Sequence, residues 1–242
     1  YQVIGNGSNL LVGDRGIRGL VIEMLSKEDE ICVEDDCITV GAGMLLSKTA
    51  NRAAEHGLTG MEFAAGIPGS IGGAVVMNAG AYGGEMKDIL TAVTVLDQEG
   101  NEKILSAEEL ELGYRTSCIL KKGYIVTGAK IKLKHGEETA IRARMEELKK
   151  QRVEKQPLEY PSAGSTFKRP EGYFAGKLIM DAGLRGYLVG EAQVSEKHCG
   201  FVINRGNATA ADVRTLMQNV ADIVEEKFGV RLEPEVKMIG EF

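Results

Sequence analysis

Three short clusters contain the polar residues best suited to chemistry: Tyr114-Arg115, Ser162–Arg169 and Glu233–Lys237. An arginine fork can bind a carboxylate, a serine hydroxyl in a polarised network can donate a proton, and a glutamate can polarise its neighbours. Each residue type also has an ordinary role, as a surface ion pair, a turn hydroxyl or an outward position on a strand. Residue type alone favours the ordinary roles, so the elements that position these clusters have to be considered.

A glycine-rich stretch from Phe63 to Glu85 is the segment around which the chain is organised. Glycine loses more conformational entropy on folding than other residues, so a helix or strand rarely contains this many. Glycines permit close backbone approach and positive φ, which a large flat or anionic ligand can use. The apolar residues between them exclude a flexible linker, which would be polar. We therefore expect backbone wrapped around a cofactor, with a structural loop as the alternative.

A second polar, glycine-containing segment, Gly5–Asp14, follows a strand end at Tyr1–Gly5. Its amide and side-chain donors could surround an anion such as a pyrophosphate. Asparagine and glycine also form ordinary hairpin turns, so turn and cradle stand as equal alternatives at this point. A fold rarely begins in the middle of a strand, and we expect an N-terminal part to be missing.

Composition excludes several classes of function. The chain has 242 residues, 43% hydrophobic and 26% charged, with a net charge of -6, which gives no reason to expect nucleic-acid or membrane partners. No apolar run is long enough to span a bilayer. The four cysteines and three histidines lack metal-ligand or redox-pair spacing, which favours reduced thiols and no metal. Walker loops, nucleophile elbows and the dinucleotide fingerprint are absent from the sequence.

Periodicity and turn signals predict an α+β chain without regular βαβ alternation. Strands, mainly antiparallel, are expected at 19–23, 31–34, 37–41, 92–96, 103–105, 124–127 and 129–133. Helices are expected at 44–56 and at 137–152, where a charged helix joins two lobes, and Ser106–Glu109 has the form of a capping box that opens a short helix. The C-terminal lobe is expected to contain helices at 175–182 and 208–228 and strands at 200–204 and 233–239.

Five motifs follow one another along the whole chain: Asn6–Val12, Gly66–Gly73 with Asn78–Gly83, Tyr114-Arg115, Ala163–Lys168 and Leu232–Val236. Together they resemble the UDP-N-acetylenolpyruvoylglucosamine reductase family. One glycine motif would be weak evidence, but five motifs in family order are specific. The short segment between Glu137 and Ser162 resembles the shorter type of this family, which lacks an inserted tyrosine-bearing loop over the substrate.

The resemblance implies an FAD-binding fold of the vanillyl-alcohol-oxidase (PCMH) type in two α+β subdomains, plus a C-terminal α+β substrate-binding lobe. It implies an FAD-binding domain over 1–136 whose N-terminal part is missing, a linker helix and boundary at 137–160, and a substrate domain at 161–242. The implied activity is the FAD-dependent reduction of UDP-N-acetylglucosamine enolpyruvate to UDP-N-acetylmuramate with NADPH. This reaction belongs to bacterial peptidoglycan precursor synthesis.

The resemblance also assigns catalytic roles. Ser165 falls on the family's proton donor, Arg115 on its active-site arginine and Glu235 on its active-site glutamate. In the implied reaction, flavin N5 delivers hydride to the enolpyruvyl double bond and Ser165 supplies the proton. Arg115 binds the substrate carboxylate as enolate-like charge develops, and Glu235 polarises the site. Either Lys168 or Glu235 could polarise Ser165, and the sequence leaves this open.

Binding residues follow from the same match. The implied cofactor-binding residues are Gly5, Asn6, Gly7, Ser8, Asn9, Leu10, Gly66, Ile67, Pro68, Gly69, Ser70, Gly72, Gly73, Asn78, Ala79, Gly80, Ala81 and Tyr82. The implied substrate-binding residues are Tyr114, Arg115, Lys168, Arg169 and His198, of which the last two depart from the asparagine and glutamine of the longer family type. Arg152 is either near the flavin or pyridine nucleotide or an ordinary solvated helix charge.

The expected partner is the small-molecule substrate, in a bacterial cytoplasmic protein. The sequence leaves the oligomeric state open and slightly favours a monomer. Two other functions are considered. One is a different flavin oxidoreductase of the same fold, such as an oxidase of small alcohols, which would consume oxygen without NADPH. The other is a non-catalytic flavin or nucleotide-sugar binding module, against which the joint presence of Arg115, Ser165 and Glu235 argues.

Overall fold

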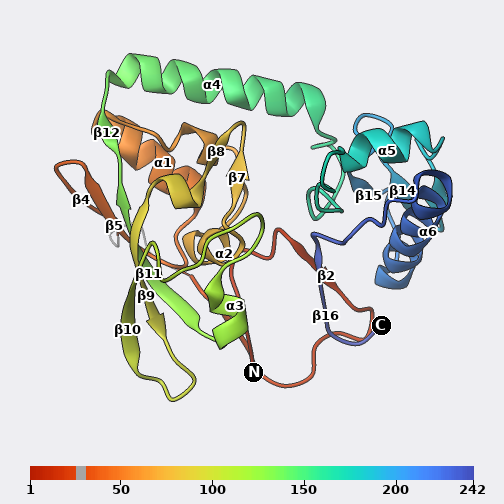
Figure 1. Ribbon diagram of the computed structural model, residues 1–242, viewed down its shortest axis with the longest axis horizontal. Coiled ribbons are helices and arrows are strands. Elements are labelled where there is room, and N and C mark those ends of the chain that lie inside the picture. The colour runs from red at the N-terminus through yellow and green to blue at the C-terminus, as the bar shows by residue number, and fades with distance from the viewer. Residues whose placement is uncertain (26–30) are drawn as a thin grey trace. The chain divides into compact units, whose positions relative to one another are not determined.

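The computed structural model describes residues 1–25 and 31–242, which form two compact units (Figure 1). Unit 1 contains Tyr1–Gly7 and Leu20–Arg152, and unit 2 contains Ser8–Gly19 and Val153–Phe242. The predicted FAD-binding domain over 1–136 included Ser8–Gly19, whereas the structure places that segment in unit 2. The reason is strand pairing, because β2 (Leu10–Val12) is hydrogen-bonded in parallel to β16 (Lys237–Ile239) near the C-terminus.

A five-stranded antiparallel sheet is the centre of unit 1, in the order β10-β9-β11-β5-β4. Its strands are β4 (Ile31–Glu34), β5 (Cys37–Gly41), β9 (Leu90–Leu96), β10 (Glu102–Ser106) and β11 (Ile125–Lys132). In β5 the side chains of Ile38 and Val40 are buried while Thr39 is exposed, which is the alternation of a strand with one face on a core. The strands predicted at 124–127 and 129–133 are one strand, because a bulge within β11 keeps it paired with β9.

Short strand pairs surround this sheet in unit 1. They are β1 (Gln2–Ile4) with β3 (Val21–Glu23), β6 (Leu58–Thr59) with β12 (Lys134–His135), and β7 (Gly80–Ala81) with β8 (Gly84–Glu85). The pair β1 and β3 is parallel. The strand predicted at 19–23 therefore exists in part, but it does not belong to the antiparallel sheet.

The glycine-rich stretch contains a helix, α2 (Ile71–Met77), which was not predicted there. Ser70 caps its N-terminus by accepting a hydrogen bond from the Gly73 amide, and Asn78, with φ 42°, ends it in the left-handed conformation. Ile71 and Val75 are fully buried, and α2 packs against β11 and β5. Tertiary burial therefore overrides the low helix propensity of its glycines.

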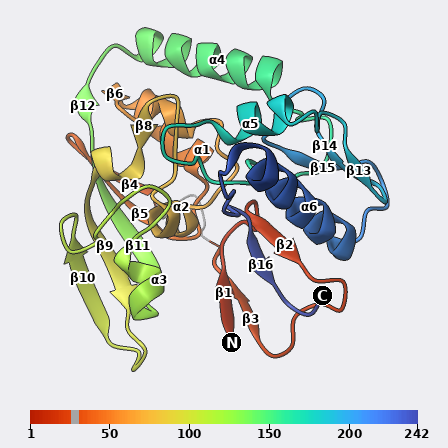
Figure 2. The ribbon, with the colours of Figure 1, turned by 45° about the vertical axis from the view of Figure 1, so that its right-hand side comes forward.

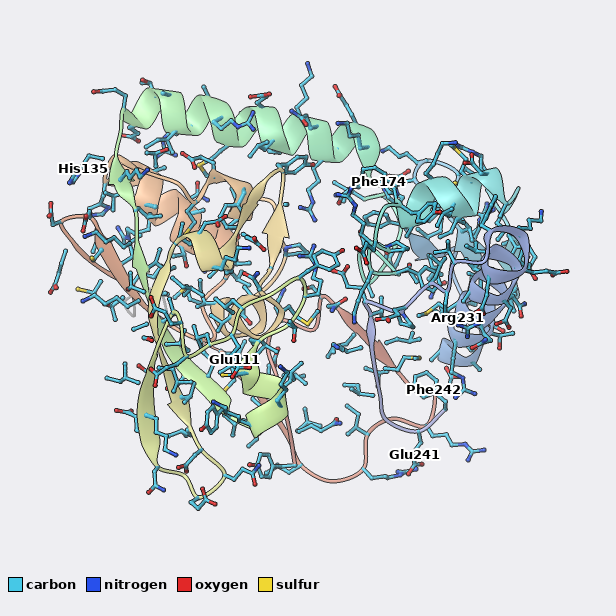
Figure 3. The ribbon with its side chains drawn as sticks, viewed as in Figure 1. Glu111, His135, Phe174, Arg231, Glu241 and Phe242 are labelled. Atoms are coloured by element: carbon cyan, nitrogen blue, oxygen red, sulfur yellow. The ribbon has the colours of Figure 1, made fainter. Side chains whose placement is uncertain are left out.

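The capping box predicted at Ser106–Glu109 forms, but no helix follows it. The Ser106 amide donates to Glu109 Oε2 at 2.8 Å and the Glu109 amide donates to Ser106 Oγ at 3.4 Å. Glu111, labelled in Figure 3, has φ 49°, and this left-handed residue ends the turn before a helix can extend. The helices of unit 1 are α1 (Leu46–Glu55), α2, α3 (Cys118–Lys122) and most of α4 (Glu138–Lys155), with 3₁₀ turns at Glu62–Ala64 and Met86–Asp88.

Unit 2 combines a small sheet with two helices (Figure 2). The antiparallel sheet contains β13 (Leu188–Val189), β14 (Ala192–Val194) and β15 (Val202–Asn204), and the helices are α5 (Ala175–Asp181) and α6 (Ala210–Phe228). Asp14, from the segment that contains β2, accepts hydrogen bonds from the Ala210 and Ala211 amides at the start of α6, at 2.7 and 2.9 Å. The N-terminal segment Ser8–Gly19 is therefore a structural part of unit 2.

Each unit has its own hydrophobic core. In unit 1, Ile38, Val93 and Ile131 from the sheet pack with Leu46 of α1 and Val75 of α2. In unit 2 the core gathers residues of α5, the small sheet and one face of α6, among them Ile179, Val194, Leu216, Val220 and Val224. No described helix is both long and apolar enough to cross a membrane.

Candidate active site

Arg115 lies in a tight turn of unit 1. Gly113 and Thr116 are paired as an isolated antiparallel bridge, with mutual amide-to-carbonyl hydrogen bonds of 3.1 and 3.3 Å. Arg115 has φ 54°, in the left-handed region that costs energy for a residue with a Cβ. Its Nη2 donates to the Gly80 carbonyl at 3.3 Å, and its guanidinium stacks 5.0 Å from the centroid of the Tyr114 ring. The predicted arginine therefore sits beside the glycine-rich stretch, although 35 positions separate it from Gly80.

Asn78 connects that stretch to the turn that carries Arg115. Its side chain is fully buried, and Nδ2 donates to Glu85 Oε2 at 2.7 Å and to the Gly113 carbonyl at 3.1 Å. Its Oδ1 accepts a hydrogen bond from the Lys87 amide at 2.9 Å. These bonds occupy the Asn78 amide with protein partners, and its assignment to the cofactor stays a prediction.

The two glycine-containing motifs of unit 1 meet each other. Asn6 Nδ2 donates to the Pro68 carbonyl at 2.7 Å. A Cβ on Gly5 would lie 2.2 Å from Ser70 Oγ and would force that hydroxyl out of the position in which it caps α2. Gly7 has φ +68°, and no atom lies within 4 Å of the position that a Cβ would take there. Gly66 and Gly73 are both exposed to solvent. Exposed glycine backbone from two segments thus gathers in one place.

Other glycines of the stretch are required by the packing of the protein itself. A Cβ on Gly80 would lie 2.6 Å from the Gly84 carbonyl oxygen, and one on Gly84 would lie 2.6 Å from the Phe63 ring. A Cβ on Gly72 would lie 3.0 Å from that of Ala42. These glycines therefore have a structural reason, and the assignment of Gly72 and Gly80 to the cofactor stays a prediction. The exposed backbone at Gly66 and Gly73 is accessible to a ligand.

Arg152, near the end of α4, belongs to the same region of unit 1. A Cβ on Gly66 would lie 3.2 Å from Arg152 Cδ, so the arginine stem lies against glycine backbone. Desolvation lowers the pKa of Arg152, while the nearby Tyr82 acts in the opposite direction. The side chain is only partly exposed. This environment disfavours the solvated helix charge considered for Arg152.

In unit 2, Ser165 and Glu235 come from neighbouring hydrogen-bonded segments. The Glu235 amide donates to the Thr166 carbonyl at 2.8 Å, Phe167 and Pro234 form an isolated antiparallel bridge, and the Lys168 amide donates to the Glu233 carbonyl at 2.8 Å. The Ser165 side chain is exposed, whereas Thr166 is buried. The structure thus brings together two of the three predicted catalytic residues, which are far apart in sequence.

Asn9 fixes the other side of the Glu235 backbone. Its Nδ2 donates to the Glu235 carbonyl at 3.2 Å, and its own carbonyl accepts from the Lys237 amide at 2.9 Å. Asn9 is predicted to bind the cofactor. In unit 2 its side chain has this structural partner 226 positions away, which no local pattern could indicate.

The remaining predicted substrate residues of unit 2 surround the same strands. Lys168 Nζ pairs with Glu233 Oε2 at 3.0 Å, with a side chain about one third exposed. Arg169 donates from Nε to the Tyr173 carbonyl at 3.2 Å, and its guanidinium lies 4.0 Å from the ring centroid of Phe174, which Figure 3 labels beside α5. Both cations therefore have protein partners that orient them, and their contact with substrate stays a prediction.

His198 is held in one tautomer. Its Nδ1 accepts a hydrogen bond from the Gly200 amide at 3.1 Å, so the proton of the neutral ring is on Nε2. The ring meets Phe201 edge-on at 5.1 Å. Desolvation lowers the pKa of His198, against a smaller upward effect of its backbone hydrogen bond. The side chain is therefore a neutral donor at neutral pH.

The buried thiols are poor nucleophiles, and the described residues contain no metal-binding cluster. Burial raises the pKa of the Cys118 and Cys199 thiols, which keeps them protonated and unreactive. Among residues 1–25 and 31–242, no group of three or more His, Cys, Asp or Glu side chains could hold a metal ion.

Comparison with known proteins identifies the family. Residues 1–106 match a family model described as an FAD binding domain, and residues 156–239 match the C-terminal domain of UDP-N-acetylenolpyruvoylglucosamine reductase. A reductase of that name from Agathobacter rectalis is 62% identical to this chain over an alignment of 252 positions, gaps included. The alignment covers 99% of this chain and 80% of the relative. The chain belongs to the UDP-N-acetylenolpyruvoylglucosamine reductase family.

Further members of the reductase family support this. The reductase of Clostridium tetani is 57% identical, covering 100% of this chain and 78% of the relative. The crystal structure of the Thermus caldophilus reductase has a TM-score of 0.85 and 42% identity, covering 99% of this chain and 85% of that chain. The predicted family and its α+β FAD-binding fold are confirmed, which favours this enzyme class over an alcohol oxidase or a non-catalytic module.

The residues present fit an FAD molecule. Exposed glycine backbone at Gly7, Gly66 and Gly73 is held together by the Asn6–Pro68 and Gly5–Ser70 contacts within unit 1. A Cβ at Gly5 would displace the Ser70 hydroxyl, so the glycine at this position keeps the two segments in close contact. Such backbone can approach a flat or anionic group, so these residues would hold part of the cofactor.

Several residues important to this arrangement were not predicted. Ser117 is fully buried and donates from Oγ to the Val76 carbonyl at 2.8 Å, and Thr166 Oγ1 accepts from the Val202 amide at 2.9 Å. For Glu85, the sequence gives only its place at the end of the glycine-rich stretch. Ser117 and Thr166 bond to residues 41 and 36 positions away, so no local sequence pattern could indicate their roles. Glu85 bonds to Asn78, which is only 7 positions away, and there the spacing could have indicated the contact.

Proposed function

We propose that this chain reduces UDP-N-acetylglucosamine enolpyruvate to UDP-N-acetylmuramate at the expense of NADPH, in peptidoglycan precursor synthesis. Membership of the reductase family supports the reaction. The observation that carries the assignment of residues is the pairing in unit 2, where the Glu235 amide donates to Thr166 next to Ser165. When bound, FAD supplies the hydride to the enolpyruvyl group.

The roles of the chain's own residues follow from their chemistry. Arg115 binds the substrate carboxylate through its planar fork and stabilises the negative charge that develops there. Ser165 Oγ delivers a proton to the substrate carbon next to that carboxylate, and Glu235 polarises its surroundings. Glu235 is a candidate to act on Ser165 because its backbone amide bonds to the carbonyl of Thr166, the residue next to Ser165.

Binding of the nucleotide sugar would use the cations and donors of unit 2. Lys168 and Arg169 supply positive charge for the diphosphate, and the neutral His198 supplies an Nε2–H donor. A cytoplasmic location stays a prediction of the sequence.

Ser165→Ala tests the proton donor. The variant, loaded with FAD, should still be reduced by NADPH, while its reoxidation by the enolpyruvyl substrate slows by about 10²–10⁴-fold, the usual contribution of a general acid. Stopped-flow absorbance separates the two half-reactions. Ser106→Ala, at the end of β10, is a control that should behave like the unsubstituted protein.

Two outcomes contradict this proposal in different ways. Reoxidation of Ser165→Ala at the normal rate would remove Ser165 from the role of proton donor. If the unsubstituted, FAD-loaded protein does not oxidise NADPH when the enolpyruvyl substrate is added, the proposed reaction itself is wrong.

A further inference from the structure

The turn that carries Arg115 is held to the glycine-rich stretch from three directions. Asn78 Nδ2 donates to the Gly113 carbonyl at 3.1 Å, Ser117 Oγ donates to the Val76 carbonyl at 2.8 Å, and Arg115 Nη2 donates to the Gly80 carbonyl at 3.3 Å. The Asn78 and Ser117 side chains are fully buried. The turn is therefore fixed to the end of α2 by side-chain bonds on both sides of Arg115.

Most of the described non-glycine residues with left-handed backbone lie in or next to these two segments, the glycine-rich stretch and the turn that carries Arg115. Apart from Asp35, the described non-glycine residues with positive φ are Asn78, Tyr82, Glu111 and Arg115. Such conformations persist only where surrounding contacts determine them, and they cluster at functional sites. The contacts that determine the Arg115 turn are the three bonds to the glycine-rich stretch.

We propose that Asn78 is a positioning residue that holds the Gly113–Thr116 turn so that Arg115 meets the substrate carboxylate. This inference rests on the proposed function for the identity of the group that Arg115 binds. The bond from Asn78 to Gly113 is its physical basis, because Gly113 is two residues before Arg115 and starts the bridge with Thr116.

A simpler role for Asn78, as the C-terminal cap of α2, does not account for its side chain. A left-handed cap uses the backbone and needs only a residue that tolerates positive φ, which glycine does best. Here the amide group makes three hydrogen bonds, to Glu85, Gly113 and Lys87. Glu85 in turn pairs with Lys87 Nζ at 2.6 Å, so its carboxylate orients the Asn78 amide toward Gly113.

Asn78→Gly separates these roles, because glycine keeps the left-handed cap and removes only the side chain. In hydrogen exchange, the Gly113 and Thr116 amides should exchange about tenfold faster or more, since their bridge loses an anchor. In the FAD-loaded protein the KM for the enolpyruvyl substrate should rise roughly ten- to hundredfold, the cost of displacing a positioned group by about 1 Å.

The double variant Asn78→Asp with Glu85→Gln identifies which hydrogen bond matters. The new glutamine amide can donate to the new aspartate, which restores the bond between positions 78 and 85, and the aspartate still accepts from the Lys87 amide. No donor then faces Gly113. We expect normal exchange in the Gly80–Glu85 hairpin, but the fast exchange of the Arg115 turn and the raised KM seen with Asn78→Gly.

Asn101→Ala is the matched control. Asn101 also bonds through Nδ2, to Asp97 at 3.3 Å, but it lies between β9 and β10 away from the candidate site. It should change neither the exchange of the Gly113 and Thr116 amides nor the KM.

Each result decides the inference. Unchanged exchange of the turn in Asn78→Gly overturns it even if activity falls, and a double variant with normal exchange and KM also overturns it. If the unsubstituted protein lacks the proposed activity, the proposed function fails separately, and the exchange measurements still decide whether Asn78 holds the turn.

Discussion

Two regions of the molecule hold their candidate catalytic residues by different kinds of hydrogen bond. One is the Gly113–Ser117 turn of unit 1, and the other is the pair of segments in unit 2, Ser165–Lys168 and Glu233–Lys237. In the turn, buried side chains of Asn78 and Ser117 bond to backbone carbonyls. In unit 2, the two segments are joined mainly by backbone amides that bond to backbone carbonyls, and the Asn9 side chain adds a bond to the Glu235 carbonyl.

The difference determines which substitutions each region tolerates. Backbone-to-backbone bonds survive most changes of side chain, because every residue except proline has the same amide and carbonyl. Side-chain anchors are lost with a single substitution, and the left-handed Arg115 then loses the contacts that hold it. The turn should therefore lose catalytic geometry through residues that never touch the substrate, whereas unit 2 should lose it chiefly through Ser165 and Glu235 themselves.

The largest expected effect in this comparison is that of Arg115→Asn. Asparagine tolerates the left-handed φ of 54° but cannot bind a carboxylate through a fork. We expect kcat/KM to fall roughly hundredfold. Hydrogen exchange of the turn should change little, because the Asn78 and Ser117 anchors remain and the Arg115–Gly80 bond, the longest of the three at 3.3 Å, is the one that is lost. Steady-state kinetics and exchange measure the two quantities. Arg115→Lys, which keeps the charge, should lose less, and a large increase in exchange in Arg115→Asn would show that Arg115 itself anchors the turn.

A matched pair of buried hydroxyls tests the comparison directly. Ser117→Ala removes the bond to the Val76 carbonyl, and Thr166→Val removes the acceptor of the Val202 amide. Each should lower the free energy of unfolding by about 1–3 kcal/mol, the cost of leaving a buried backbone group unsatisfied. Denaturant titration measures this.

Kinetics distinguish the two variants. Ser117→Ala should also raise the KM for the enolpyruvyl substrate by roughly tenfold, because it loosens the turn of Arg115. Thr166→Val should leave the KM nearly unchanged, because the Glu235 amide still donates to the Thr166 carbonyl. Equal effects on the KM would remove the distinction between the two regions.

The smallest expected effect concerns pH and His198. Its pKa in the folded protein is lowered from the usual 6.5, mainly by desolvation, so folding opposes its protonation. The stability that the neutral ring contributes is present above about pH 6.5 and is lost as the pH falls through the lower, folded pKa. Thermal melting between pH 7 and pH 5 should show a smaller decline in His198→Gln than in the unsubstituted protein. Equal declines would mean that His198 contributes nothing to the pH dependence.

Much of the fold could be predicted from periodicity. Helices α1, α4, α5 and α6 and the strands of the five-stranded sheet appear close to their expected positions. Helix α2 could not be predicted, because burial of Ile71 and Val75 against the sheet outweighs the unfavourable propensity of its glycines. The helix expected after Ser106 fails for a local reason, the left-handed Glu111.

The sequence by itself determined the family and the residue types of the candidate site, because ordered motifs carry that information regardless of how the chain folds. Only the tertiary structure decided how those residues are held. The bond from Asn78 to Gly113 spans 35 positions and that from Asn9 to Glu235 spans 226. Hydrogen bonds of that separation depend on the path of the whole chain, so no local pattern of residues can specify which asparagine binds a ligand and which anchors a turn.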